Sequence, residues 1–480
     1  MTFGMKRILL TVHKFFPEHR AGTEVLTLKV ARELMARGYE VLVVTANPPD
    51  LDARHAVGNE TEDYVFQDVP VHVIGEPLRL RGYTFHHEYF HPGVKTHFGE
   101  VMERFKPDIL HIFHAQNLSS SIIDEACERG VPVVCSTTDF WFVCPIVQLK
   151  RPDGSVCRGP GPGGRNCLTC YTPNLFPPQS QFDEALAKRY PGLASALSAA
   201  KPLSRFLFET YKTKKRPQAE DATLKRPGVL RDAANRTRAI MVPTKLMRDI
   251  FVENGIRADL IEHVPFGIDT APLIPYQKKV PSNVLRIGFI GTLFEHKGTD
   301  LLIKAFHQLP ADAPAVLKIY GDPNQFPEYG SLLKKLAAEG RHREQIEFLG
   351  TFPNEQLGEV LANLDILVVP SRWYENTPLV IQSSLATRTP LLVTDLGGMS
   401  EIVKHGENGL LFTLNDVESL KVQLQSLLDD PSLAKRLSDN IPPERTTAEM
   451  VDDIEKVYRE RCTEKPMGAS CDQAQAQARV

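Results

Sequence analysis

The chain has 480 residues, of which 42% are hydrophobic and 24% are charged, and its formal net charge is −3 at pH 7. This length allows two or three domains with cores of their own, and the composition is that of a globular protein. The small net charge excludes a global basic field for nucleic acid. No apolar run approaches the ~20 residues that cross a bilayer, and the N-terminal stretch MTFGMKRILLTVHKFF lacks the features of a signal peptide. We therefore expect a cytoplasmic protein, with membrane contact only at its surface.

Short apolar runs alternate with amphipathic stretches in the first half of the chain. The segment TEVLTLKVARELMARG, at 23–38, predicts a helix because its apolar residues recur at helical spacing and Gly38 follows them. The predicted strands of this half lie at 7–13, 39–46, 107–115 and 131–139. Strands that alternate with helices indicate a parallel sheet with helices on both faces.

The same alternation restarts after a Pro-rich polar segment, APLIPYQKKVPSN, which predicts a linker. Five more predicted strands lie at 286–291, 315–322, 345–350, 365–371 and 390–395. The fold class is therefore α/β, with two doubly wound, Rossmann-like domains. We place the boundaries as follows: a first domain at 1–269, the linker at 270–283, a second domain at 284–442, a helix at 443–462 that either continues the second domain or returns to the first, and a disordered tail at 463–480.

Ligands of open α/β sheets bind beyond the carboxyl ends of the strands, so the residues that follow each predicted strand are candidates for a site. Gly22, Thr23 and Glu24 stand between the first predicted strand and its helix. A glycine before a helix lets backbone N–H groups approach an anion. An ordinary turn with Thr23 as N-cap is the alternative.

A second candidate is GTLFEHKGTD, which follows the predicted strand at 286–291. Gly291 allows a close backbone approach, and Lys297 supplies a mobile cation for a phosphate. The order of residues is not that of a Walker loop. A solvated loop lysine is the alternative.

A third candidate is YENTPLVIQSSLA, where Thr377 predicts an N-cap and Pro378 the first helical residue. The free N–H groups of Leu379 and Val380 would then face an anion together with the positive end of the helix dipole. Glu375, just outside this helix, could accept hydrogen bonds from a polyhydroxyl group.

In order and spacing, these motifs resemble the retaining GT-B glycosyltransferases of glycosyltransferase family 4. The matching motifs are GTE after the first strand, PDILHIFH, TDFWFVCP, VPTKLMRDIFVENG, FGID, GTLFEHKG, DILVVPS, YENTPLVIQSSLA and TDLGGMSEIVKHGENGLLF. The resemblance implies a GT-B fold, with two Rossmann-like domains facing a central cleft. It also implies a metal-independent retaining glycosyltransferase that moves a sugar from a nucleotide-diphosphate sugar to a glycan, lipid-linked or small-molecule acceptor. Cell-surface polysaccharide or glycoconjugate synthesis is the expected setting.

The resemblance also assigns roles by position. It places Lys297 on the donor diphosphate, Glu375 on the donor sugar, and the amides of Leu379 and Val380 on the phosphates. The other expected substrate-binding residues are Gly22, Thr23, Glu24, Gly291, Thr292, Asn376, Thr377 and Ser383.

Three positions depart from the family pattern. Ser383 replaces the second acid of the E-x7-E pattern, Thr292 replaces an arginine, and Thr138 replaces a histidine. We expect Asp139 and His114, each at a predicted strand end, to take catalytic positions in place of that histidine, although a structural role for His114 is the alternative.

Loss of a ribose-binding acid should weaken substrate binding more than turnover, because the diphosphate-binding groups remain. We therefore expect an active enzyme. A catalytically silent relative that binds a nucleotide sugar or a polysaccharide is the alternative. A nucleotide-sugar 2-epimerase on the same fold is disfavoured by the motifs FGID and YENTPLVI.

Four of the eight cysteines share one Gly- and Pro-rich stretch, in the pattern C-x12-C-x9-C-x2-C: Cys144, Cys157, Cys167 and Cys170. In a cytosolic protein this pattern predicts a closed tetrahedral Zn site rather than disulfides. An Fe–S cluster could use the same ligands. Four reduced thiols in a loop are the alternative.

The segment 201–228 is basic and carries an apolar patch. It could lie on an anionic membrane at its inner face, which would suit a lipid-linked acceptor. A solvated helical face is the favoured interpretation of this segment.

Overall fold

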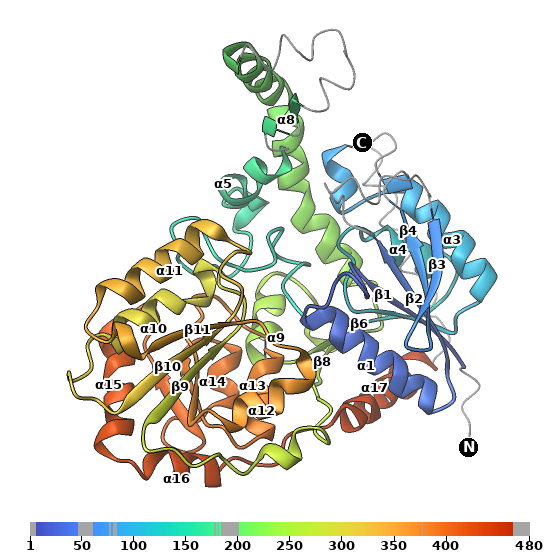
Figure 1. The fold of residues 1–480 in the computed structure, drawn as a ribbon. Coiled ribbons are helices and arrows are strands. Elements are labelled where there is room, and N and C mark those ends of the chain that lie inside the picture. Colours follow the sequence, from blue (N-terminus) through green and yellow to red (C-terminus); the bar gives the residue numbers. More distant parts are fainter. Residues whose placement is uncertain are drawn as a thin grey trace. The chain divides into compact units, whose positions relative to one another are not determined.

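The structure is a computed structural model that describes residues 6–46, 61–75, 78–79, 84–176, 179–180, 182–183, 201–376 and 378–463. The chain forms two compact units, each built around its own sheet (Figure 1). The first comprises Met1–Ile240, Ile250–Ile261 and Arg461–Val480, and the second comprises Met241–Asp249 and Glu262–Glu460. The predicted disordered tail, apart from Thr463, lies outside the described residues.

The sheet of the first unit has the strand order β3-β4-β2-β1-β5-β6-β7-β8. These strands are β1 (Arg7–Val12), β2 (Glu40–Ala46), β3 (Thr61–Phe66), β4 (Val69–Ile74), β5 (Ile109–Ile112), β6 (Val133–Ser136), β7 (Ala239–Val242) and β8 (Ile261–His263). Strand β1 pairs in parallel with β2 and β5, and only the hairpin β3–β4 among the registered pairs is antiparallel. The strands predicted in this half are confirmed, whereas β3, β4, β7 and β8 were not predicted.

Helices of the first unit include α1 (Gly22–Ala36), α3 (Pro92–Phe105), α4 (Ser121–Glu128) and the long α8 (Lys201–Ala234), and α9 (Lys245–Glu253) falls across both units. Helix α1 buries Leu26, Val30 and Leu34, which recur every four residues, as the amphipathic pattern predicts. Among the described residues, no helix is both long and apolar enough to cross a membrane.

The sheet of the second unit is parallel throughout, with the order β11-β10-β9-β12-β13-β14. Its strands are β9 (Leu285–Ile290), β10 (Ala315–Tyr320), β11 (Ile346–Gly350), β12 (Ile366–Val369), β13 (Leu391–Thr394) and β14 (Gly409–Phe412). The five predicted strands are confirmed, and β14 was not predicted. Because the chain builds outward from β9 on one side and then from β12 on the other, β9 and β12 form the switch point of the sheet.

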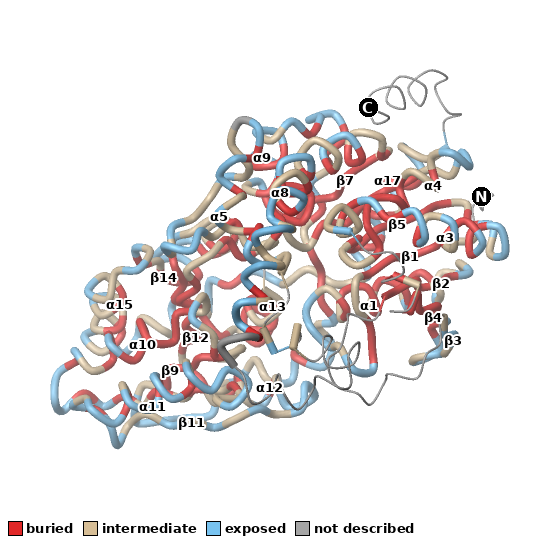
Figure 2. Tube along the Cα trace, turned by 90° about the horizontal axis from the view of Figure 1, so that it is seen from above, coloured by how far each residue is buried: buried red, intermediate tan, exposed pale blue. Residues whose placement is uncertain are grey.

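Helices cover both faces of this second sheet: α10 (Thr299–Phe306), α11 (Pro327–Glu339), α12 (Leu357–Ala362), α13 (Leu379–Ala386), α14 (Gly398–Ile402), α15 (Val417–Asp429) and α16 (Leu433–Asp439). Along β12, Ile366 and Val368 enter one buried cluster while Leu367 and Val369 enter the other. This alternation explains why the strand is apolar at every position. Figure 2 shows the strands as the buried centre of the unit.

The predicted linker packs against the second unit. Gln277 Nε2 donates to the Ala386 carbonyl at 3.0 Å, and Lys279 Nζ donates to the Leu361 carbonyl at 2.9 Å. A Cβ at Gly358 would lie 2.3 Å from the ring of Tyr276, so a side chain there would displace this segment. The last helix, α17 (Thr447–Cys462), begins within the second unit, and its final residues are grouped with the first.

Candidate functional site

An ion pair lies beyond the switch point of the second sheet. Lys297 follows β9, Glu375 follows β12, and Lys297 Nζ lies 2.6 Å from Glu375 Oε1. The same oxygen accepts hydrogen bonds from Ser371 Oγ at 2.7 Å and from Trp373 Nε1 at 2.8 Å. Three donors therefore converge on one carboxylate oxygen, and the structure brings together the two residues that the sequence predicted as the donor site.

Glu375 is buried, with 6% of its surface exposed. Burial opposes its ionisation, but the Lys297 ammonium and the two neutral donors outweigh it and hold the pKa of Glu375 below its ordinary value. The Lys297 ammonium also lies 5.4 Å from the centre of the Trp373 ring, within range of a cation–π interaction. Glu375 is therefore ionised at neutral pH and lies among aromatic and polar side chains.

The loop that carries Lys297 is fixed to the end of β12. Gly298 has φ +72°, and a Cβ there would lie 2.0 Å from the Pro370 carbonyl oxygen, so only glycine fits. Arg372 donates to the Glu295 carbonyl at 3.0 Å and pairs with Asp300 at 2.8 Å. These contacts set the position of the ammonium group through the backbone on both sides of it.

Helix α13 begins at Leu379 beside this pair, with Pro378 at the N-cap position. The prediction that Pro378 is the first helical residue is wrong by one position, because its ψ of 134° is extended rather than helical. Thr377, the predicted N-cap, lies outside the described residues. Leu379 and Val380 are the first two helical residues, whose N–H groups have no partner within a helix.

The other predicted donor residues lie around the same sheet edge. Gly291 and Thr292 come directly after β9, and Asn376 lies between Glu375 and α13. Ser383 is on α13 with 6% of its surface exposed, and its carbonyl accepts the Thr387 N–H.

A second cluster of polar residues lies beyond β5 and β6 in the first unit. His114 Nε2 lies 2.8 Å from Asp139 Oδ2, and both residues line one pocket. The Gln116 N–H donates to His114 Nδ1 at 3.0 Å, so Nε2 carries the proton that is donated to Asp139. Asp139 Oδ1 accepts the Trp141 N–H at 2.9 Å. The structure thus pairs the two residues predicted to replace the missing histidine.

His13 and Glu24 extend this cluster. The ring centres of His13 and His114 are 4.3 Å apart, and His13 Nε2 lies 3.6 Å from Glu24 Oε1. Burial raises the pKa of Glu24, while burial and the neighbouring His114 hold the pKa of His13 well below its ordinary value. Glu24 Oε2 and His13 Nδ1 are buried without a hydrogen-bond partner among the described residues.

His13 was not predicted as a site residue. The available signal was its place at the end of the predicted strand 7–13. Thr23 Oγ1 donates to Thr138 Oγ1 at 2.8 Å, which ties the start of α1 to the residue beside Asp139. A Cβ at Gly22 would meet no atom within 4 Å, so space is open at the start of this helix.

A buried ion pair, also not predicted, supports the Asp139 loop. Arg226 on α8 pairs with Glu88 at 2.7 Å and donates to the Trp141 carbonyl at 2.9 Å. Trp141 Nε1 donates to the same Glu88 at 3.2 Å. The backbone that positions Asp139 is therefore anchored by an arginine from a distant part of the sequence.

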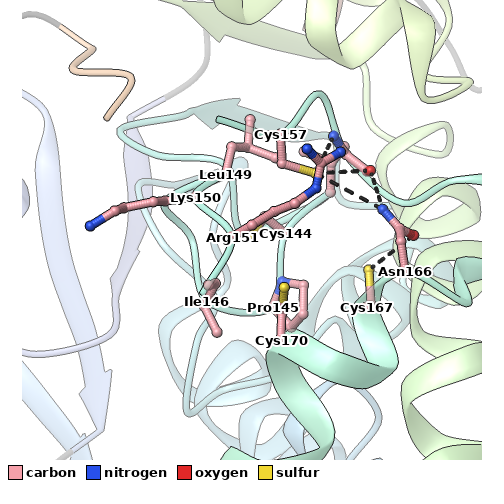
Figure 3. A pocket seen from close by; sticks show the side chains of 12 residues that line it. Cys144, Pro145, Ile146, Leu149, Lys150, Arg151, Cys157, Asn166, Cys167 and Cys170 are labelled. Carbon is pink, nitrogen blue, oxygen red and sulfur yellow. Dashed lines mark hydrogen bonds between the residues drawn. The ribbon is translucent and has the colours of Figure 1, made fainter. Parts of the chain in front are cut away.

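The four predicted cysteine ligands line a single pocket: Cys144, Cys157, Cys167 and Cys170 (Figure 3). Burial raises the pKa of Cys144 and Cys170, and it raises that of Cys167 to about 12. Within the described ranges, no group of three or more His, Cys, Asp or Glu side chains is already arranged to hold a metal ion.

Two family models match the chain. The model described as Glycosyl transferases group 1 matches residues 273–442, and that described as Glycosyltransferase Family 4 matches residues 20–152. A segment of each half of the chain therefore matches a glycosyltransferase family. Each of the two candidate sites lies at least partly within one of the matched segments.

Curated relatives match parts of the chain. An exopolysaccharide phosphotransferase of Streptomyces coelicolor is 33% identical over 174 residues, 36% of this chain and 18% of the relative. A D-inositol 3-phosphate glycosyltransferase of Nocardia farcinica is 30% identical over 194 residues, 38% of this chain and 43% of the relative. The chain therefore spans less than half the length of these relatives.

Solved structures match almost the whole chain in fold. Anabaena HepE, solved in complex with UDP and glucose, has a TM-score of 0.61 at 16% identity and covers 95% of this chain and 99% of its own. Sucrose-phosphate synthase of Thermosynechococcus elongatus has a TM-score of 0.62 at 15% identity and covers 95% of this chain and 98% of its own. The chain thus has the GT-B fold.

Proposed function

We propose that this chain is a retaining glycosyltransferase that moves a sugar from a nucleotide-diphosphate sugar to a hydroxyl-bearing acceptor. The observation that carries the proposal is the Lys297–Glu375 pair beside the start of α13. It combines a cation, a buried ionised acid and the first backbone N–H groups of a helix at one sheet edge. The family matches and the UDP complex of HepE support a nucleotide-sugar donor.

The chemistry follows from where charge develops. Cleavage of the sugar–phosphate bond places negative charge on the leaving diphosphate and positive character on the sugar. Lys297 and the amides of Leu379 and Val380 would stabilise that diphosphate, and one preorganised donor is typically worth a factor of about 10²–10³ in rate. Glu375 would accept hydrogen bonds from the sugar hydroxyls. No metal ion is required for this charge compensation.

The first unit would bind the acceptor, with the second unit binding the donor. The Asp139 carboxylate is oriented by two groups, the His114 ring and the Trp141 N–H, which suits hydrogen bonding to an acceptor hydroxyl. The unpartnered atoms of His13 and Glu24 are further groups that a polar ligand could satisfy. Glycan and lipid-linked acceptors both present such hydroxyls, and the names of relatives from exopolysaccharide and lipopolysaccharide synthesis favour a cell-surface product.

We place the enzyme in the cytoplasm, with α8 as its contact to the inner face of the membrane. Phe206 on this helix is 66% exposed. Arg216, which lies ten residues further along the helix, is 71% exposed at its side chain. Flotation with anionic vesicles tests this contact against neutral vesicles. A fully solvated helix would float with neither.

The decisive experiment supplies the purified protein with GDP-, UDP-, TDP- and ADP-sugars and measures release of the nucleoside diphosphate. We expect release with one nucleotide class, and a product whose anomeric configuration, read by NMR, equals that of the donor. A catalytically silent binding protein would show a thermal shift with a nucleotide sugar but no release. An inverted product would contradict the retaining mechanism.

A further inference from the structure

The four-cysteine pocket of the first unit has no part in the proposed transfer. Its sulfurs come from two segments: Cys144 and Cys157 lie in a loop, and Cys167 and Cys170 lie on α5 (Cys167–Tyr171). Figure 3 shows all four side chains around the same pocket. Since Cys167 and Cys170 are three residues apart on a helical turn, their side chains share one face.

One of the loop cysteines receives a backbone hydrogen bond. The Gly159 N–H, two residues after Cys157, donates to the Cys157 sulfur at 3.4 Å. Backbone N–H groups directed at a sulfur stabilise a thiolate, which is the form that binds a metal.

The turn after Cys157 depends on glycine. Gly159 has φ +116°, and a Cβ there would lie 2.3 Å from Asn254 Oδ1. Asn254 Nδ2 in turn donates to the Arg158 carbonyl at 2.7 Å, and Arg158 pairs with Glu253 at 2.8 Å. The position of the Cys157 sulfur is therefore set by contacts outside its own loop.

The cysteine segment contains little regular structure to hold it. Between β6 and α5, the described residues form an isolated bridge between Lys150 and Val156 and one short 3-10 turn at Pro162–Gly164. A segment with so little regular structure is stabilised most by a cross-link, such as a bound metal ion. All four cysteines are free thiols in the structure.

We propose that Cys144, Cys157, Cys167 and Cys170 bind one structural Zn²⁺ ion. Four sulfur ligands from two short segments fit the tetrahedral preference of Zn²⁺ and leave no open position for water or substrate. Metal binding would draw the four sulfurs together and order the segment around them, because binding and local folding are coupled at such sites.

The ion would act on the neighbouring site through the backbone. Cys144 lies three residues after Trp141, whose N–H holds Asp139 and whose carbonyl accepts from Arg226. Zinc would therefore hold the loop that orients Asp139, as a positioning element of the first unit. This consequence for activity rests on the proposed transfer, whereas the metal site itself does not.

The first test is elemental analysis of protein purified without a metal-affinity tag. We expect about one zinc per chain, since one closed site uses all four ligands. Cys157→Ser and Cys167→Ser each remove one of the four proposed ligands. Each variant should lower the zinc content by about tenfold or more, because changes around a metal site typically cost at least that factor in metal affinity. Cys127→Ser and Cys462→Ser, cysteines outside the pocket, are the matched controls and should retain it.

The second test does not depend on variants that fold. Co²⁺ replaces Zn²⁺ in the wild-type protein, and the absorption spectrum should show sulfur-to-metal charge transfer and the visible bands of tetrahedral Co²⁺. Protein without zinc that also fails to give this spectrum would overturn the proposal, as would an iron-sulfide chromophore or disulfides found among these cysteines by mass spectrometry. A variant that loses zinc but still binds nucleotide at the second unit would show that the metal site and the proposed donor site can be tested independently.

Discussion

The candidate sites of the two units lie at equivalent places in their sheets, but they differ in the charges of their side chains. In the second unit, Lys297 and Glu375 follow β9 and β12, and in the first unit His13 and His114 follow β1 and β5. Both strand pairs are neighbours at which the direction of sheet growth changes. The fold thus supplies the location, and the side chains alone distinguish what each location can bind.

In the second site a cation pairs with the acid, whereas in the first site two buried groups, His13 and Glu24, are shifted toward their neutral forms. Glu375 is ionised because a cation and two neutral donors meet its oxygen. His13 is kept neutral by burial, and Glu24 beside it has a raised pKa. A preorganised cation suits a diphosphate, whereas a site with buried polar atoms that lack partners among the described residues suits a hydroxyl-bearing ligand.

The largest expected effect is on the charged site. Lys297→Ala should lower kcat/KM by about 10²–10³, because it removes one preorganised donor to the diphosphate. It should also lower the free energy of unfolding by roughly 1–3 kcal/mol, since the buried Glu375 loses a partner. Nucleoside diphosphate release and denaturant unfolding measure the two effects.

Two variants control this experiment. Lys335→Ala removes an exposed lysine that pairs with Glu339 on α11, and it should change neither quantity. The double variant Lys297→Ala/Glu375→Gln should recover stability but not activity, because the buried acid is then neutral. Wild-type turnover in Lys297→Ala would remove this lysine from the site.

A smaller effect is expected at the site of the first unit. Asp139→Asn should lower turnover by up to about 10²-fold, because it alters the carboxylate that we propose orients the acceptor. Nucleotide affinity, followed by Trp373 fluorescence, should stay unchanged. Asp63→Asn, at an exposed aspartate that contacts His72 in the same unit, is the matched control. A parallel loss of nucleotide affinity would show that the two sites are not separate in function.

The two sites should also respond to acid at different pH values. Burial holds the pKa of His13 well below its ordinary value and lowers that of His111 to about 3, so the unfolded chain takes up protons that the folded unit does not. The first unit should lose roughly 1.4 kcal/mol per pH unit per histidine as the pH falls below about 6.5. The lowered pKa of Glu375 instead gives stability that is present above its ordinary value of 4.5 and is lost below it.

The two tryptophans of the chain report this difference separately. Trp373→Phe leaves Trp141 as the reporter of the first unit, and Trp141→Phe leaves Trp373 as the reporter of the second. Unfolding curves between pH 7.5 and pH 4 should shift first for Trp141. Coincident shifts would contradict the assignment of neutral histidines to one site and an ionised acid to the other.

The smallest effect concerns Ser383, where the family pattern has an acid. Ser383→Glu should tighten nucleotide binding by about tenfold or less, as one hydrogen-bonded carboxylate adds little more. Ser384→Glu is the contrast, because Ser384 is fully buried and its Oγ donates to the Thr389 carbonyl at 2.9 Å. Ser384→Glu should unfold the unit. If Ser383→Glu behaves in the same way, Ser383 is a packing residue.

Sequence patterns were sufficient where local rules decide the structure. The apolar runs of β1, β2, β9 and β12 predicted buried parallel strands, and the family resemblance placed Lys297 and Glu375 in one donor site. Sequence patterns did not predict the elements whose structure depends on contacts with distant parts of the chain. The strand β3 lies at the edge of its sheet, and none of its residues is buried.

The support around Asp139 could not be predicted for the same reason. The Arg226–Glu88 pair joins residues 138 positions apart, and nothing local marks either as a partner of Trp141. The N-cap of α13 was misplaced by one residue because Pro378 suits both the cap and the first helical position, and its extended ψ decides between them.

The close contact between Gly298 and Pro370 limits how the loops of the proposed donor site can be redesigned. The two residues belong to loops more than 70 positions apart, yet the backbone of one leaves no space for a single added carbon beside the other. A donor loop transplanted from a relative would therefore fail unless the turn after β12 is exchanged with it. Segments 291–298 and 370–376 should therefore be exchanged together, and variant libraries at the proposed donor site should change both segments.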